Sequence, residues 1–121
     1  MSNCPISVGQ NDDGLTVEKF INKTYDSSSK NRKKALSDLC PCKVKEDFPV
    51  VWERIISMTE DESGEVREQA LHNLGDGSPR HMEERVMQVV EKLYNDPDLK
   101  VRKKARKMCI SYRKTGKWNV L

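Results

Sequence analysis

Residues 95–109 read NDPDLKVRKKARKMC, and two earlier segments repeat their pattern at a spacing of 35 residues. These segments are residues 60–74, EDESGEVREQALHNL, and residues 25–39, YDSSSKNRKKALSDL. Three positions hold one amino acid in every copy, namely Asp26, Asp61 and Asp96, Arg32, Arg67 and Arg102, and Ala35, Ala70 and Ala105. Identities that recur twice at one spacing, without a gap, indicate an internal structural repeat.

Each copy predicts a helix that follows a turn. The turns are rich in Asp, Ser, Gly and Pro, and Ser63 and Asp98 stand where a helix N-cap is expected. Apolar or small residues then recur at every fourth position, as in Val66, Ala70 and Leu74, and again in Val101, Ala105 and Cys109. We therefore expect a buried stripe on each helix, with Cys109 in a core position.

A second amphipathic pattern precedes each of these helices. In the middle unit it starts near Asp47, with Pro49 in the first turn, where proline is tolerated. Its apolar residues fall on one helical face: Phe48, Val51, Trp52, Ile55 and Ile56. The last unit has the same pattern after Ser78 and Pro79, with Met82, Val86, Val89, Val90 and Leu93. The first unit is the poorest, with Val17, Phe20 and Ile21 on a short helix. These patterns predict an all-α chain of three helical hairpins.

With an Asp in the turn before a Val-Arg-x-x-Ala helix, the chain resembles the HEAT-repeat family, and specifically its short HEAT-like units. The resemblance implies a right-handed α-α superhelix, a short solenoid. It also implies a ladder of hydrogen bonds between successive units, carried by Asp26, Asp61 and Asp96 with Arg32, Arg67 and Arg102. We expect each aspartate to accept from the arginine of the next unit. Asn31 replaces the valine of the other units, so the second helix of the first unit should be less firmly buried.

The repeat sets the expected domain boundaries. We expect a flexible N-terminal arm at 1–12 and a repeat domain at 13–115, with units of about 13–42, 46–76 and 79–115. Residues 75–79 are expected to form a helix C-cap, a turn and the next N-cap. Gly116 suits the position after the last helix, and residues 116–121 should fold back as a capping tail over the open end of the solenoid or dock on another protein.

Composition and charge narrow the class of protein. Leu, Ile, Val and Phe make up only 26 of 121 residues, which fits a thin, extended core. The apolar runs are too short for a membrane span and no signal peptide is recognisable, so we expect a cytoplasmic monomer. The net charge of +3 combines a balance of −7 over residues 43–98 with +9 over residues 99–121. Such asymmetry points to an acidic or anionic partner.

Residues that could perform catalysis are few, and we expect neither an enzyme nor a cofactor. The two histidines, His72 and His81, accompany no nucleophile at a recognisable spacing, and no phosphate-binding loop is present. His72 should be exposed on the second helix of the middle unit. We expect the Asp and Arg residues that recur in the repeat to have a structural role and not a catalytic one, because structural ion pairs can resemble functional sites.

Four cysteines leave one alternative open. Cys40 and Cys42 form a C-x-C pair, a weak metal signal, and Cys4 lies in the N-terminal arm. A zinc site would need further ligands from His72, His81 or Cys109. Otherwise Cys40 and Cys42 end a helix and pack under the loop. A metal- or redox-responsive module through this pair is thus a further hypothesis for function.

The main functional hypothesis is a scaffold that binds another protein on the surface of the second helices. HEAT-like stacks turn these helices toward a concave face, and equivalent positions of the three units supply the predicted binding residues: Lys33, Lys34, Glu68, Gln69, His72, Asn73, Lys103, Lys104 and Lys107. This face would be basic at both ends and mildly acidic in the middle. The alternative is nucleic-acid binding through the basic residues of the first and last units, although a phosphate track favours uninterrupted positive charge.

Overall fold

The computed structural model of the chain describes residues 13–40 and 48–117. These residues form six α-helices: α1 (Asp13–Lys23), α2 (Ser29–Asp38), α3 (Pro49–Ser57), α4 (Gly64–Gly77), α5 (Glu83–Leu93) and α6 (Leu99–Thr115). A short 3₁₀ helix, η1 (Met58–Glu60), follows α3, and a second one, η2 (Arg80–Met82), precedes α5. The described residues contain no β-strand, which confirms the predicted all-α class. None of their helices has the length and apolar character that crossing a membrane requires.

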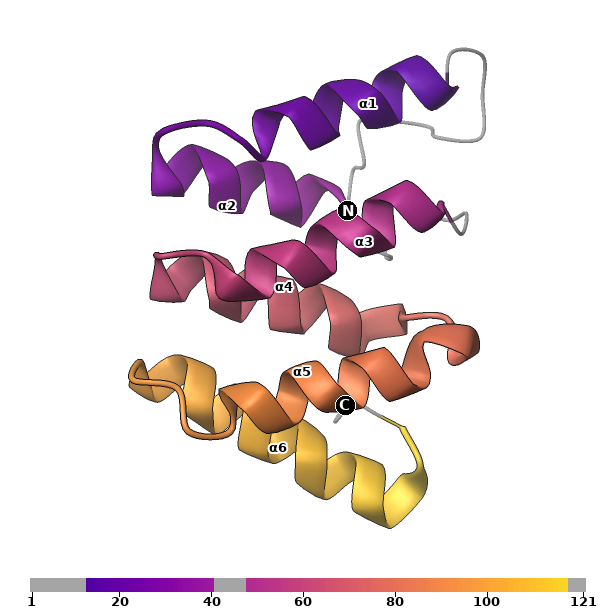
Figure 1. The fold of residues 1–121 in the computed structure, drawn as a ribbon, viewed down its shortest axis with the longest axis vertical. Helices are drawn as coiled ribbons and strands as arrows, with labels where there is room; N and C mark the ends of the chain where they lie inside the picture. The colour runs from indigo at the N-terminus through magenta and orange to yellow at the C-terminus, as the bar shows by residue number, and fades with distance from the viewer. Residues whose placement is uncertain (1–12, 41–47, 118–121) are drawn as a thin grey trace.

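The helices form three hairpins stacked in two layers (Figure 1). Helices α1, α3 and α5 make one layer, and α2, α4 and α6 make the other. Within the second layer α4 contacts both α2 and α6, so it is the central helix of that layer. The layer of second helices therefore presents one face on which residues of all three hairpins lie close together.

Local sequence explains where these helices begin and end. Asp98 caps α6, because its Oδ1 accepts from the backbone N–H groups of Lys100 and Val101. Ser28 caps α2 in the same way through Asn31. Ser63 occupies the N-cap position of α4, but its side chain makes no capping hydrogen bond. Gly116 ends α6 with a φ of 76°, a left-handed conformation that favours glycine, as predicted.

One continuous core joins the three hairpins. The predicted stripes of α4 and α6 are buried, with Val66, Ala70, Leu74, Val101 and Ala105 all at 0% exposure. Each large side chain buried in this way contributes roughly 1.5–3 kcal/mol to folding. The expectation for Cys109 holds only in part: it is half-buried at the edge of the core, and the preceding Met108 is the buried residue.

Two helix boundaries differ from the prediction. Residues 75–77 continue α4 to Gly77 instead of forming a turn, since the N–H of Ser78 still donates to the carbonyl of Leu74. Gly75 suits this helix because a Cβ there would lie only 3.1 Å from the methyl of Met108 on α6. After Pro79 the chain first makes η2, and α5 starts only at Glu83.

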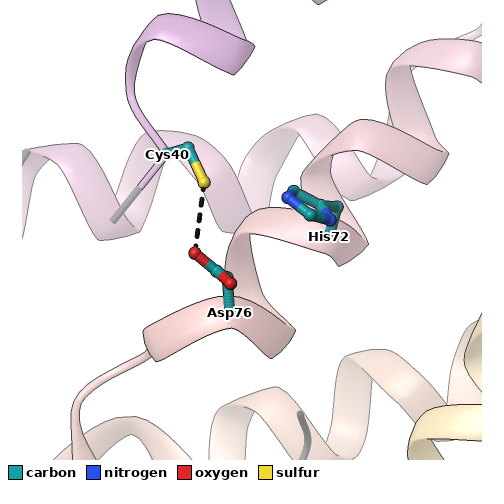
Figure 2. Close-up of side chains that lie close together, drawn as sticks. All are labelled: Cys40, His72 and Asp76. Carbon is teal, nitrogen blue, oxygen red and sulfur yellow. Dashed lines mark hydrogen bonds between the residues drawn. The ribbon is translucent and has the colours of Figure 1, made fainter. Parts of the chain in front are cut away.

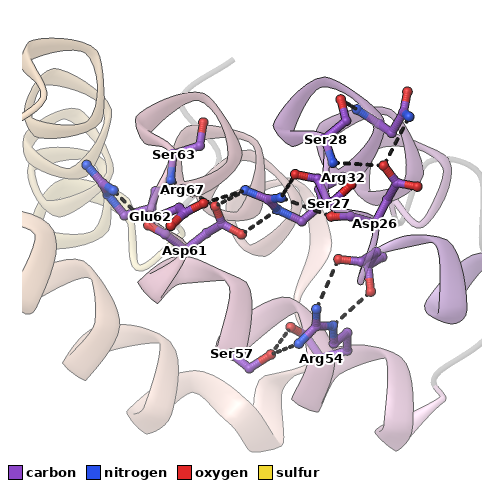
Figure 3. Close-up of polar contacts among 12 residues, drawn as sticks. Asp26, Ser27, Ser28, Arg32, Arg54, Ser57, Asp61, Glu62, Ser63 and Arg67 are labelled. Atoms are coloured by element: carbon purple, nitrogen blue, oxygen red, sulfur yellow. Dashed lines mark hydrogen bonds and ion pairs between the residues drawn. The ribbon is translucent and has the colours of Figure 1, made fainter.

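The predicted ladder links successive hairpins through buried arginine–aspartate pairs. Figure 3 shows the pair of Arg32 and Asp61. Arg32 donates from Nε and Nη2 to the two carboxylate oxygens of Asp61, at 2.9 and 3.0 Å. Arg67 donates to Asp96 in the same way, with both distances 2.9 Å. The expected direction was wrong: each aspartate accepts from the arginine of the preceding unit, not of the next.

The same arginines also fix the turns of their own units. Arg32 and Arg67 each donate through Nη1 to the carbonyl of the aspartate six residues earlier, and Arg102 does so to Asp96. At the first unit, Asp26 accepts instead from its own turn and helix, through the Ser28 N–H and the Asn31 side chain. Each arginine therefore closes its own turn, and the first two also hold the next hairpin.

A second contact between hairpins was not predicted from the sequence. Arg54 on α3 donates from Nε to Thr24 Oγ1 at 2.8 Å and from Nη2 to the Thr24 carbonyl at 3.0 Å (Figure 3). Its guanidinium also lies 3.6 Å from the ring centroid of Tyr25. The only trace of this contact in the sequence is that threonine recurs at positions 24 and 59, 35 residues apart; arginine at position 54 does not recur in the other units.

Candidate functional site

Eight of the nine residues predicted to bind a partner lie on the outward-facing side of α2, α4 and α6; the exception is Asn73. We call this face the second-helix surface and define it by eight residues: Lys33, Lys34, Glu68, Gln69, His72, Lys103, Lys104 and Lys107. Five of them, together with Ser37 and Cys40, line a single pocket of about 320 Å³: Lys33, Glu68, Gln69, His72 and Lys104. The structure thus brings together residues of three helices that are up to 71 positions apart.

The other three lysines lie outside this pocket lining. Lys103 and Lys107 are exposed on α6, and Lys34 is exposed on α2, where its Nζ lies 3.7 Å from Asp38. Lys103 and Lys107 add positive charge to α6, whereas the charge of Lys34 is partly balanced by Asp38. Glu68 is the acidic residue of the pocket lining, between the lysines of α2 and those of α6.

Asn73 does not belong to the binding surface, and its prediction as a partner-binding residue was wrong. The side chain is 0% exposed, because position 73 faces α2 instead of the solvent. Its Nδ2 donates to the carbonyl of Leu36 on α2 at 2.8 Å, and its Oδ1 accepts from Gln69 at 2.9 Å. Asn73 therefore joins two helices and orients a pocket residue.

Cys40, His72 and Asp76 form a compact group beside the pocket (Figure 2). Cys40 follows the end of α2 and is buried, while His72 and Asp76 lie one turn apart on α4. The Cys40 Sγ donates to an Asp76 carboxylate oxygen at 3.4 Å. One potential ligand atom from each of the three residues lies within 4.8 Å of the other two.

Comparison with known proteins adds no relative. Neither protein-family models nor curated proteins nor solved structures gave a match to the chain.

The metal candidates named from the sequence separate in the structure. Cys40 and His72 come together, whereas His81 lies on η2 and Cys109 on α6, and neither belongs to the group with Cys40. Cys4 and Cys42 lie outside the described residues. Cys40 and Cys109 form no disulfide within the described part of the chain.

Asp76 is the member of this group that sequence reasoning missed. It was assigned to a turn between two glycines, where its side chain would have had no fixed direction. A four-residue spacing between His72 and Asp76 places both on one helical face, and this was the available signal. This spacing predicts neighbouring side chains only if α4 continues past Gly75, as it does in the structure.

Proposed function

We propose that the chain is a non-enzymatic, HEAT-like module that binds another protein through the second-helix surface. The single observation that carries this proposal is the pocket shared by α2, α4 and α6, which is lined by five of the residues predicted to bind. The buried arginine–aspartate ladder supports the HEAT-like assignment, because its pairs recur at the spacing of the repeat. A cytoplasmic location would fit the free thiols of Cys40 and Cys109, because disulfides are rare in the cytosol.

The charges of the second-helix surface indicate which charge pattern a partner would carry. Lysines flank the pocket on both sides, Lys33 from α2 and Lys104 from α6, and Glu68 lies between them. A protein segment with acidic side chains at its two ends and a polar or basic residue in the middle would match this order. Charge complementarity of this kind selects the partner and accelerates its association.

Nucleic-acid binding is the second candidate, carried by the lysines of α2 and α6. Glu68 in the middle of the surface opposes it, because each phosphate contact is expected from a cation. The substitution Glu68→Lys separates the two candidates. It would join the basic positions and strengthen binding to duplex DNA, whereas it would weaken binding to a protein segment that places a basic residue there.

A site-specific cross-linker tests the location of the partner. A photoreactive amino acid at Gln69, in the pocket, should capture a protein from the native lysate, while one at Gln88, exposed on α5 in the opposite layer, should not. The substitution Lys104→Glu should lower the affinity for the captured partner about tenfold, which corresponds to about 1.4 kcal/mol.

Two outcomes would contradict the proposal. Capture of the same protein from positions 69 and 88 with equal yield would move the contact away from the second-helix surface. Tight binding to duplex DNA that falls steeply with salt, and that Glu68→Lys enhances, would establish the nucleic-acid function instead.

A further inference from the structure

We propose that Cys40, His72 and Asp76 form a zinc site that joins the end of α2 to α4. The three residues offer a sulfur, an imidazole nitrogen and a carboxylate oxygen, which is a donor set that Zn²⁺ binds. Magnesium and calcium bind oxygen ligands and would use only one of these three donors. The proposal is independent of the protein partner, since it concerns a ligand that the chain would hold by itself.

The distances are close to those that a tetrahedral zinc ion requires. Zinc–ligand bonds of roughly 2.0–2.3 Å at tetrahedral angles place neighbouring ligand atoms about 3.5 Å apart. The Cys40 Sγ and the Asp76 carboxylate oxygen are already 3.4 Å apart. All three ligand atoms lie within 4.8 Å, so closing around the ion needs movements of only about 1 Å. His72 is exposed, which leaves its ring room for such a movement.

The backbone that carries these ligands is held in place on both helices. Leu39 and Leu74 flank the site in sequence and are 1% and 0% exposed, respectively. Asn73, next to His72, donates to the carbonyl of Leu36, so the end of α2 and the middle of α4 are tied together before any ion binds. A site between rigid elements loses little conformational entropy when it closes.

Charge also balances at this site. When zinc binds, the Sγ–H bond of Cys40 breaks, the proton passes to the solvent and the thiolate electron pair forms the bond to zinc. The thiolate and the Asp76 carboxylate then contribute two negative charges against the two positive charges of the ion. Cys40 and His72 line an open pocket, through which a water molecule can reach the ion as a fourth ligand.

Cobalt(II), which replaces zinc and reports its ligands spectroscopically, is the probe for this proposal. The full chain, stripped of metal with a chelator, should bind one cobalt ion per chain with the visible spectrum of a tetrahedral site and a thiolate-to-cobalt charge-transfer band. Zinc should displace the cobalt. A variant in which Cys40 is the only cysteine, made by replacing Cys4, Cys42 and Cys109 with serine, should retain the charge-transfer band.

Two substitutions on α4 test the other ligands without removing a buried side chain. His72→Ala and Asp76→Asn should each weaken cobalt binding by more than the 10- to 100-fold that the loss of an outer-sphere contact typically costs. Circular dichroism should show both variants folded, because His72 is exposed and asparagine retains the shape of aspartate. His81→Ala, on η2, is the matched control and should bind cobalt as the wild type does.

Several results would overturn the proposal. The wild-type chain could give no tetrahedral cobalt spectrum, or the variant with only Cys40 could lose the charge-transfer band, which would assign the thiolate to another cysteine. Unchanged cobalt affinity in folded His72→Ala or Asp76→Asn would remove that residue from the site. Each of these outcomes is distinguishable from a failure of protein binding, because no partner takes part in the measurement.

Discussion

Asp61 connects two hairpins through a single carboxylate. It accepts two hydrogen bonds from Arg32 and one from the backbone N–H of Ser63, so both of its oxygens are used. The side chains of Asp61 and Arg32 are only 12% and 10% exposed, which limits the screening of their charges by water. At this scale, stability depends on leaving neither charge without its partner.

Replacing Asp61 should therefore destabilise the protein. We expect Asp61→Asn to lower the free energy of unfolding by about 2 kcal/mol, because it leaves the buried guanidinium of Arg32 without a counter-charge. Urea denaturation at neutral pH measures this change. Asp26→Asn is the matched control: it alters the same repeat position, but Asp26 pairs only with its own turn, so its loss should be clearly smaller.

Acidification should remove the contribution of Asp61. Burial, the largest single effect, raises the pKa of this carboxyl, but the hydrogen bonds from Arg32 and Ser63 and the positive charges of Arg32 and Arg54 together lower it by more, so the pKa lies below its ordinary value. The unfolded chain then binds the proton more readily, and the stabilisation is complete above roughly pH 5 and declines as the pH falls through the lowered pKa. The difference between wild type and Asp61→Asn should shrink on this acidic side; a difference that grows there would contradict the assignment.

Single residues also show what could be predicted from the sequence. The residues of the ladder were predictable, because the repeat marks the Asp and Arg positions three times, but the direction of the pairing was not: Arg32 donates to Asp61 of the following unit. Asn73 was misplaced because a polar side chain on a polar helix predicts exposure, and only the structure shows that it faces the carbonyl of Leu36. A contact that occurs once in the chain, such as this one, leaves no periodic signal.

At the scale of helices, Asn73 should determine how firmly α2 holds α4. We expect Asn73→Ala to lower the free energy of unfolding by about 2–3 kcal/mol, since it removes one buried and one partly buried hydrogen bond and leaves a cavity. Thermal or urea denaturation measures this loss. Gln69→Ala is the control, because it removes only the bond from Gln69 to Asn73 and should cost less. An Asn73→Ala protein that is as stable as the wild type but no longer binds its protein partner would contradict this role and would indicate that Asn73 contacts the partner.

Helix types were predictable from apolar spacing, whereas two boundaries were not. Glycines 75 and 77 predict a helix end, yet α4 continues through both. The reason is tertiary: Gly75 admits the Met108 side chain of α6, and packing between hairpins outweighs the weak helix propensity of glycine. This extension also brings Asp76 to the side of α4 that carries His72, so the boundary and the proposed site depend on the same contact.

At the scale of the molecule, the hairpins should unfold together because one core runs through all of them. We expect Leu36→Ala, in the first hairpin, to lower the free energy of unfolding by about 2–5 kcal/mol, since Leu36 is completely buried. Amide hydrogen exchange should show that α6, in the last hairpin, loses protection as well. Leu99→Ala is the control, because Leu99 is 54% exposed.

Unchanged protection of α6 in Leu36→Ala would contradict this expectation of cooperative unfolding.

The low content of large apolar residues is no obstacle to cooperativity. Residues such as Leu36 and Leu71 occupy equivalent, fully buried positions, and the same position in the last unit is Arg106, which is exposed on α6. The chain thus places apolar residues where a neighbouring hairpin covers them and a charged residue where the described stack ends.

The arginine–aspartate ladder restricts how the length of such a chain can change during evolution. The middle unit carries both an acceptor for the unit before it, Asp61, and a donor for the unit after it, Arg67, and each donor lies 29 residues before its acceptor. Duplication or loss of whole 35-residue blocks would leave all remaining pairs matched, wherever in the block the recombination occurred. An insertion of any other size within a helix would separate a donor from its acceptor. Growth of the chain by complete units is therefore the change that the ladder tolerates.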